Sequence, residues 1–327
     1  MTPRKSAARP TPRTPRAPAK VAIESIPLVQ GTKGHPAFGL GLWAFGRWKP
    51  EDEARTKATL GRAYERGIRW LDTAEVYGNG RSERLLGDVL ARAAGGAPDV
   101  YVTTKVSWEH LRPAQVRASL INSLERLGRA SVDEYLVHAP DPKVPLSDTM
   151  PVLESLWKEG RIGVVGVSNF GVEELEEASK HLAEARIAVN QVRYNLFDRE
   201  DGDPIREYCA KHQILIEYSP LARGLLAGRY LDRETVPADI KRYAHRMFEP
   251  DRLPDILARA RALRDLAREA KVPLPSLALH WLSQHGIAPL VGASRPEQVD
   301  DNLASWAVRP PARILDRADA IARGDRA

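Results

Sequence analysis

The feature of this sequence that most restricts its fold is a regular alternation of short, β-branched apolar runs with amphipathic stretches. Most of these runs are nearly continuous in hydrophobicity, as expected of parallel strands that are buried on both faces. The predicted strands are Ile68–Thr73, Val100–Val106, Glu134–Ala139, Ile162–Ser168, Ile187–Tyr194, Ile214–Ser219 and Ala288–Ala293, with a weaker eighth near Trp306–Val308.

A predicted helix follows each strand, and several helices carry proline in the first turn, where its missing N–H is harmless. The predicted helices are Arg81–Ala93, Pro113–Leu127, Ser147–Lys158, Val172–Leu182, Pro204–Lys211, Pro254–Ala270, Pro275–Gln284, Pro296–Ala304 and a last one from about Pro311. This alternation favours an α/β fold, a (β/α)8 TIM barrel, with a doubly wound open sheet as the alternative.

Two extended segments precede the first of these strands. Val21–Val29 and His35–Leu42 flank a turn-rich stretch and predict a β-hairpin. This hairpin would plug the N-terminal end of the barrel, so we expect one barrel domain over residues 21–327. The one long irregular connection is Leu221–Arg252, and loops of that length are usually functional or mobile.

The basic character of the chain resides in its first 20 residues. The sequence has 49 Lys and Arg against 43 Asp and Glu, and residues 1–20 contribute six bases and no acid. The remainder is therefore neutral, and the charge is no evidence that the folded body binds nucleic acid. Five prolines and no aromatic residue in this segment predict a disordered tail. A nucleic-acid tether is a minor alternative for the tail alone.

Several classes of protein are excluded by composition and spacing. Cys209 is the only cysteine, which rules out a disulfide framework and a cysteine zinc cluster. The eight histidines form no H-x-H or H-x-x-x-H pair, so no metal site is predicted. No apolar stretch is long enough to predict a membrane span, and we expect a soluble, cytoplasmic protein whose oligomeric state the sequence leaves open.

The segment Gly39–Ala44 fits the dinucleotide-binding pattern G-x-G-x-x-A. That pattern requires a helix that opens directly from the glycines, so that the helix N-terminus meets the pyrophosphate. Here several residues intervene before a helix can start near Pro50. The segment is therefore interpreted as the end of a strand and a loop.

A cluster of reactive side chains is predicted at the carboxyl ends of the first three strands, where barrel enzymes place their chemistry. Asp72 ends the first predicted strand and Tyr77 follows in its loop, while Lys105 and His138 end the second and third. Each residue alone has an ordinary structural explanation, as a cap, a loop aromatic, an ion-pair partner or a core histidine. Their joint position is what indicates a site.

These residue types suit the reduction of a carbonyl group. A hydride that reaches the carbonyl carbon leaves charge on oxygen, so an acid must protonate that oxygen. Tyr77 would be this acid, and an ammonium such as Lys105 would favour its phenolate. Asp72 would hold Lys105 in place, and His138 would donate a hydrogen bond to the substrate oxygen.

Over roughly residues 22–325 the chain resembles the aldo-keto reductases. The resemblance rests on the segments Gly67–Gly78, Val102–Lys105, Tyr135–His138, Gly166–Phe170, Asn190–Gln191, Tyr218–Leu221 and Val291–Gln298. It implies Asp72, Tyr77, Lys105 and His138 as catalytic residues, and NADPH/NADP+ as a cofactor bound across the barrel mouth.

The resemblance also implies a cofactor role for residues from four later loops. Those implied to contact the nicotinamide, the pyrophosphate and the adenosine 2′-phosphate end are, in chain order, Ser168, Asn169, Gln191, Tyr218, Ser219, Leu221, Gly224, Leu225, Ser294, Arg295, Gln298 and Asn302. An Arg beside a helix N-terminus is a suitable partner for a phosphate dianion.

One position departs from the family pattern. Ala139 follows His138 where the family usually has a bulky aromatic residue, which puts the size of the substrate in doubt. Trp43 and Trp108 lie in loops that could wall the substrate pocket, and they could equally pack elsewhere.

The sequence therefore predicts an NADPH-dependent oxidoreductase that interconverts aldehydes or ketones and alcohols. It does not name the substrate. An NADP(H)-binding regulatory subunit, similar to the potassium-channel β-subunits that share this family's fold, is the alternative.

Overall fold

The computed structural model describes residues 20–30, 33–44, 52–93, 95, 97–199, 202–212, 214–233, 236–237 and 246–325. The predicted disordered tail over residues 1–20 therefore lies almost wholly outside the described residues. Part of the long connection after the sixth predicted strand also lies outside them.

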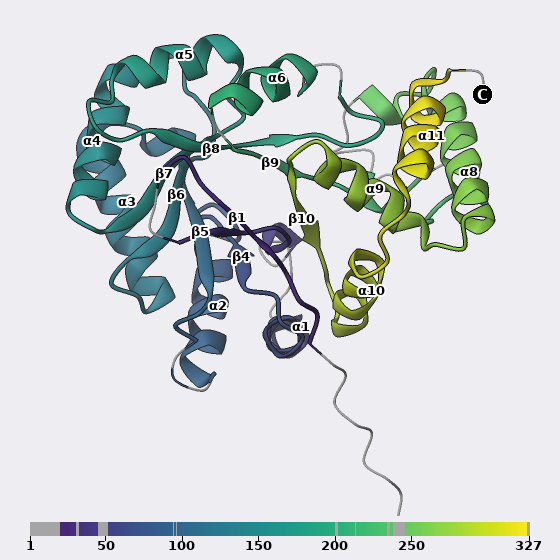
Figure 1. Cartoon of the computed structure of the whole chain (residues 1–327). Coiled ribbons are helices and arrows are strands. Elements are labelled where there is room, and N and C mark those ends of the chain that lie inside the picture. The colour runs from purple at the N-terminus through teal and green to yellow at the C-terminus, as the bar shows by residue number, and fades with distance from the viewer. Residues whose placement is uncertain are drawn as a thin grey trace, which may run out of the picture.

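Within the described residues, eight parallel strands close into a barrel in the order β10-β3-β4-β5-β6-β7-β8-β9 (Figure 1). Each strand pairs in parallel with both neighbours, which confirms the closed α/β architecture over the open sheet. The strands are β3 (Gly39–Gly41), β4 (Trp70–Asp72), β5 (Tyr101–Val106), β6 (Val132–Val137), β7 (Ile162–Ser168), β8 (Ile187–Arg193), β9 (Ile214–Tyr218) and β10 (Ala288–Gly292).

Helices surround the strands, and α8, α9 and α11 pack together on one side (Figure 1). The helices are α1 (Glu53–Glu65), α2 (Arg81–Arg92), α3 (Pro113–Leu127), α4 (Leu146–Lys158), α5 (Val172–Lys180), α6 (Gly202–His212), α8 (Leu253–Glu269), α9 (Leu274–Gln284), α10 (Pro296–Trp306) and α11 (Ala312–Arg323). None of these described helices combines the length and apolarity needed to cross a membrane.

The predicted eighth strand near Trp306–Val308 is wrong. Helix α10 continues to Trp306, whose indole stacks on His280 at 4.9 Å between ring centroids and lies 5.1 Å from the ring of Phe38. These contacts keep the apolar end of the helix in place. The eighth barrel strand is instead β3 (Gly39–Gly41), which the sequence pattern assigned to the hairpin.

The N-terminal hairpin exists but is shorter than predicted. Strand β1 (Ser25–Ile26) pairs antiparallel with β2 (His35–Pro36). Ile26 and Leu28 pack against a buried cluster inside the barrel that includes Trp70 and Tyr101, the first residues of β4 and β5. The hairpin therefore covers the N-terminal end of the barrel and leaves the carboxyl ends of the strands for a site.

Strand β3 requires glycine at its first position. A Cβ atom on Gly39 would lie 2.1 Å from Cε3 of the fully buried Trp70 on the neighbouring strand. The absence of a side chain thus allows the indole to fill the barrel interior. Because glycine weakens strand propensity, the local pattern predicts an extended segment here but does not indicate a barrel strand.

We predict that Gly39→Ala lowers the free energy of unfolding by about 1–3 kcal/mol, because the added methyl group overpacks the barrel interior. The matched control is Gly61→Ala in α1, where nothing lies within 4 Å of the added Cβ. That variant should gain about 0.5–1 kcal/mol from helix propensity. Urea unfolding measures both, and equal effects of the two substitutions would contradict the proposed overpacking.

Candidate active site

A buried ion pair lies at the centre of the candidate site. Lys105, in β5, donates a hydrogen bond of 2.6 Å from Nζ to Oδ2 of Asp72, the last residue of β4, and one of 2.8 Å to the carbonyl oxygen of Thr73. The side chains are 0% and 2% exposed. Gln191, in β8, donates from Nε2 to the same carboxylate oxygen at 2.9 Å. Three strands therefore fix this ion pair.

Tyr77 and His138 lie beside this pair. The Nζ atom of Lys105 is 5.1 Å from the centre of the Tyr77 ring. The ring centroids of Tyr77 and His138 are 5.5 Å apart, with an edge-on orientation. The four residues that the sequence predicted to converge are thus brought together at the carboxyl ends of β4, β5 and β6.

The electrostatics keep two of these groups neutral. Burial, with a smaller contribution from Lys105, lowers the pKa of His138 to about 3, so its imidazole is uncharged at neutral pH. Burial and the nearby Asp72 raise the pKa of Tyr77 well above its ordinary value. The direction for Tyr77 is opposite to the sequence-based expectation, because burial dominates and the charge of Asp72 adds to it. Tyr77 is therefore a neutral phenol that holds its proton.

A second set of polar side chains lies at the carboxyl ends of β7 and β9. The side-chain amide of Asn169 donates 2.8 Å to the carbonyl oxygen of His138, and its Oδ1 accepts 2.9 Å from the hydroxyl of Tyr218. Ser168 donates 2.8 Å to the carbonyl oxygen of Gln191. Asn169 has a left-handed backbone, with φ of 60°. These residues lie beside the four-residue cluster and are held by one another.

The loop after β9 makes a tight turn in which Ser219 and Gly224 have φ of 65° and 98°. Leu221 and Leu225 are buried in the apolar core, so their side chains serve packing. The side-chain amide of Asn195, in the loop after β8, donates 3.2 Å to the carbonyl oxygen of Ser219. The hydrogen bond from Asn195 therefore fixes the backbone at the start of this loop.

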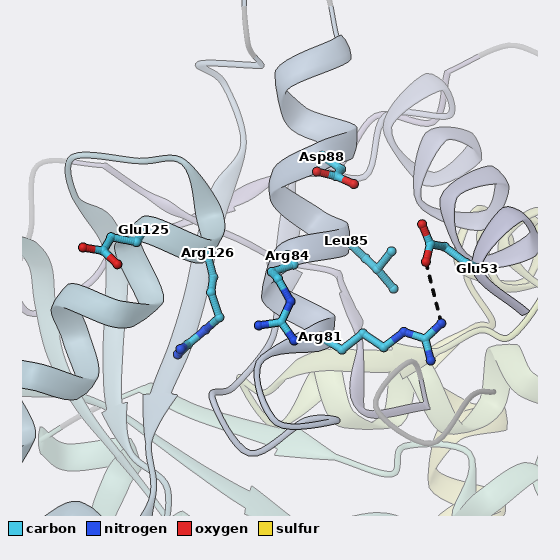
Figure 2. A pocket seen from close by; sticks show the side chains of 7 residues that line it. All are labelled: Glu53, Arg81, Arg84, Leu85, Asp88, Glu125 and Arg126. Carbon is cyan, nitrogen blue, oxygen red and sulfur yellow. Dashed lines mark ion pairs between the residues drawn. The ribbon is translucent and has the colours of Figure 1, made fainter. Parts of the chain in front are cut away.

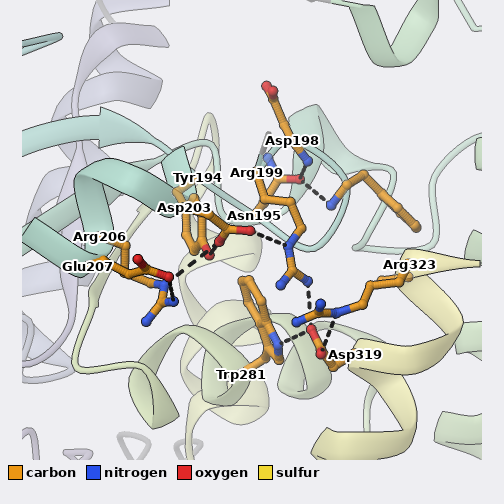
Figure 3. Close-up of polar contacts among 12 residues, drawn as sticks. Tyr194, Asn195, Asp198, Arg199, Asp203, Arg206, Glu207, Trp281, Asp319 and Arg323 are labelled. Atoms are coloured by element: carbon orange, nitrogen blue, oxygen red, sulfur yellow. Dashed lines mark hydrogen bonds and ion pairs between the residues drawn. The ribbon is translucent and has the colours of Figure 1, made fainter. Parts of the chain in front are cut away.

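A charged network ties the loop after β8 to the C-terminal helix (Figure 3). Arg199 pairs with Asp319 of α11 at 2.6 Å, and the indole N–H of Trp281 in α9 donates 3.0 Å to the same carboxylate oxygen. Tyr194 donates a hydrogen bond to Asp203. This network lies outside the barrel and braces the segment that contains Asn195.

The residues predicted at the far end of the site lie around the N-terminus of α10. The side-chain oxygen of Gln298 accepts hydrogen bonds from the backbone N–H and hydroxyl of Ser294, at 2.7 and 2.9 Å. Asn302 donates 3.2 Å to the carbonyl oxygen of Gly292. Arg295 is exposed and directly precedes the helix. Ser294 and Gln298 thus order the turn that presents the Arg295 side chain.

The predicted pocket walls are only partly in place. Trp108 is 43% exposed and its ring lies 5.8 Å from that of His138. Trp43 is 39% exposed, and the Arg223 guanidinium lies 5.1 Å from its ring centre. Ala139 is half-buried beside His138. Trp108 therefore adjoins the cluster directly, whereas Trp43 contacts the loop after β9.

One structural residue near the site was missed by the sequence analysis. The Glu75 carboxylate accepts 2.6 Å from the backbone N–H of Ser107 and lies 3.0 Å from Nδ1 of His110. It thereby ties the loop that carries Tyr77 to the loop after β5. Nothing in its spacing distinguishes it from a solvated acid.

A separate cavity of about 450 Å³ lies on the outer surface, where α2 meets α1 and α3 (Figure 2). It is lined by acidic and basic side chains, including Glu53, Arg81 and Arg126. None of the predicted site residues lines it. It is therefore distinct from the candidate active site.

The family model that matches this chain is that of the aldo/keto reductases, over residues 37–323. The chain is 33% identical over 286 residues to the aldo-keto reductase YhdN of Bacillus subtilis, covering 82% of this chain and 85% of that protein. The protein belongs to the aldo/keto reductase family.

Two further relatives carry names or titles that mention a nicotinamide cofactor. An NADH-specific methylglyoxal reductase of Escherichia coli is 29% identical over 312 residues, covering 86% of this chain and 93% of that protein. The structure of an aldo/keto reductase from Klebsiella pneumoniae in complex with NADP and acetate has a TM-score of 0.72 and 26% identity, covering 90% and 94% of the two chains.

We predict that Lys105→Met lowers the free energy of unfolding by about 3 kcal/mol, because it leaves the buried Asp72 carboxylate without its counter-charge. Combining it with Asp72→Asn should recover part of that loss, since the double variant buries no unpaired charge. A double-mutant cycle by urea unfolding measures the coupling. Strictly additive effects would show that the two side chains do not depend on each other.

Proposed function

We propose that this protein reduces aldehydes or ketones to alcohols with NADPH, and catalyses the reverse oxidation. The observation that carries the proposal is a neutral phenol next to a buried Lys–Asp pair and a neutral imidazole, at the mouth of the barrel. When bound, the dinucleotide would supply the hydride that forms the new C–H bond.

In this proposal Tyr77 donates its hydroxyl proton to the carbonyl oxygen as the hydride reaches the carbonyl carbon. The raised pKa of Tyr77 supports this role in one respect, because the acid is fully protonated before the reaction. The phenolate left behind would lie beside the Lys105 ammonium, 5.1 Å from the ring centre, which stabilises that negative charge.

His138 would orient the substrate. Its imidazole is neutral, and its Nδ1 atom is buried without a hydrogen-bond partner among the described residues. A neutral imidazole donates a hydrogen bond from one ring nitrogen without itself giving up a full proton. Such a donor, aimed at the carbonyl oxygen, would stabilise the charge that develops there.

The residues around this cluster fit a dinucleotide in an extended conformation. Ser168, Asn169 and Gln191 would meet the nicotinamide carboxamide, and the ring of Tyr218 would stack on the nicotinamide. The backbone of the loop Ser219–Leu225 would contact the pyrophosphate, since the leucine side chains point into the core. Arg295, with the N-terminus of α10, would bind the 2′-phosphate, and Ser294, Gln298 and Asn302 would surround the adenine end.

The substrate itself would lie between Tyr77, His138 and the exposed face of Trp108. The small Ala139 next to His138 leaves space there, so we propose that the pocket accepts carbonyl compounds that carry a bulky substituent. Trp43, which follows β3, would form another part of the pocket wall.

We predict that Tyr77→Phe lowers kcat for carbonyl reduction by about 10²–10⁴-fold, because it removes the proton donor. NADPH binding should be retained, as measured by the quenching of tryptophan fluorescence. Tyr64→Phe removes a phenol from the outer face of α1 and should keep wild-type turnover. Unchanged turnover in Tyr77→Phe would refute the assignment, and retained cofactor binding without any wild-type turnover would favour a regulatory subunit.

We predict that Arg295→Ala weakens NADPH binding by about tenfold, or 1.4 kcal/mol, while NADH binding changes little, because only NADPH carries the 2′-phosphate. Arg309→Ala, which removes an equal charge beyond the other end of α10, should affect neither. Fluorescence titration with both cofactors measures the ratio. Equal losses for NADPH and NADH in Arg295→Ala would mean that Arg295 does not recognise the phosphate.

A further inference from the structure

A second cluster of titratable side chains lies deeper in the barrel, on the side closed by the hairpin. Glu134, in β6, and His35, in β2, are both 0% exposed, and Tyr101, in β5, is 4% exposed. The Tyr101 hydroxyl donates 3.2 Å to Oε2 of Glu134. The rings of Trp70 and Tyr101 enclose His35 at centroid distances of 4.3 and 4.9 Å. None of these groups has a part in the chemistry proposed above.

The strand register places this cluster directly next to the ion pair. Thr103 of β5 is paired with Asp72 of β4 on one side and with Glu134 of β6 on the other. Residues at one level of neighbouring parallel strands point to the same side of the sheet. The barrel interior at this level thus contains two carboxyl groups, of Asp72 and Glu134, but only one ammonium group, of Lys105.

One ammonium can balance only one carboxylate in a water-free interior. The Asp72 carboxylate takes that role through its 2.6 Å contact with Lys105. Oε2 of Glu134 is 3.6 Å from Nε2 of His35, too far for a hydrogen bond of normal geometry. Neither Oε1 of Glu134 nor either ring nitrogen of His35 has a hydrogen-bond partner among the described residues. An ionised Glu134 would therefore be an uncompensated buried charge, which costs several kcal/mol.

We propose that Glu134 is a positioning residue for the reaction: it stays protonated at neutral pH, and its ionisation at higher pH adds a negative charge beneath Lys105 that makes Tyr77 a weaker proton donor. The proposal rests on the proposed function. It goes beyond that function by assigning an alkaline limit of the reduction to a carboxyl group that touches neither substrate nor cofactor.

The direction of the pH effect follows from the groups that face Glu134. These are Asp72 on β4, Lys105 and Tyr101 on β5, and His35 on β2; the neighbouring residue of β7, Val164, is apolar. Burial, together with the charge of Asp72, raises the pKa of Glu134 to about 8, and Lys105 and the hydrogen bonds from Tyr101 and Thr103 oppose the shift. Burial lowers the pKa of His35 to about 3, so His35 provides no positive charge in this range. As the pH rises through about 8, Glu134 becomes ionised while His35 stays neutral.

The experiment compares kcat/KM for carbonyl reduction with NADPH between pH 6.5 and 9.5. Glu134→Gln keeps the size and neutral state of the protonated carboxyl group but cannot ionise. We expect the ratio of kcat/KM at pH 9.5 to that at pH 6.5 to be about tenfold higher in Glu134→Gln than in the wild type, which corresponds to a coupling of about one pKa unit. Glu134→Leu should show the same flattened profile if it folds.

The matched control is Glu83→Gln. Glu83 is also 0% exposed, but it pairs with Arg126 and Thr104 on the outside of the barrel. This variant should keep the wild-type pH ratio. A wild-type ratio in Glu134→Gln would overturn the proposal, as would an equal loss of activity at every pH, which is the result expected of a purely structural residue.

A second measurement does not depend on activity. A carboxyl group whose pKa is higher in the folded than in the unfolded protein stabilises the fold at low pH, and this contribution is lost as the pH rises through the folded-state value. The melting temperature of Glu134→Gln relative to wild type should therefore increase between pH 5 and 9, by about 2 °C or more. A difference in melting temperature that does not change with pH would contradict the protonation of Glu134 at neutral pH. If the wild type reduces no carbonyl compound at any pH, the proposed function is refuted instead. The melting temperatures would still show whether Glu134 is protonated at neutral pH.

Discussion

The structure of the site depends on one costly interaction, the ion pair between Lys105 and Asp72 in the water-free interior of the barrel. Removing two charges from water costs more than their mutual attraction returns unless further hydrogen bonds satisfy them. Here the Thr73 carbonyl oxygen and the Gln191 side chain provide those bonds, at 2.8 and 2.9 Å. Gln191 lies on β8, whereas Asp72 and Lys105 lie on β4 and β5, so this set of bonds is complete only when the barrel is closed. This links the fold directly to the chemistry.

The closed barrel also explains why the site draws on residues so far apart in sequence. The sequence predicted the convergence of Asp72, Tyr77, Lys105 and His138, because parallel strands all end at the same rim. The strand-helix alternation could be predicted because β-branched runs and proline in the first turn of helices are local signals, and the family could be predicted from the resemblance of short segments such as Gly67–Gly78. Most predicted element ends differ from the structure by one or two residues, which is the usual fraying at termini.

Three features depended on contacts that local patterns do not contain. The strand at Gly39–Gly41 is defined by the indole of Trp70, which occupies the place of a Cβ atom. The end of α10 is held by stacking of Trp306 on His280, a contact that the apolar run near Trp306 does not reveal, and that run was therefore predicted as a strand. The pKa of Tyr77 rises rather than falls, because burial dominates and the charge of Asp72 adds to it. In each case a partner distant in sequence decided the outcome.

Contacts between residues distant in sequence also fix the proposed site, but they do so differently around the buried ion pair and in the loop after β9. Asp72 and Lys105 lie on strands and are held by buried contacts, whereas several of the proposed cofactor contacts lie on the loop after β9, whose backbone is strained. Ser219, Ala222 and Arg223 all have positive φ values, a conformation that costs free energy in residues other than glycine. Such a loop keeps its shape only if its surroundings fix it. Asn195 holds its first carbonyl group, and the Arg199–Asp319 pair braces the adjoining segment against α11. Helix α11, which contains none of the proposed site residues, therefore helps to fix the loop that we propose contacts the cofactor.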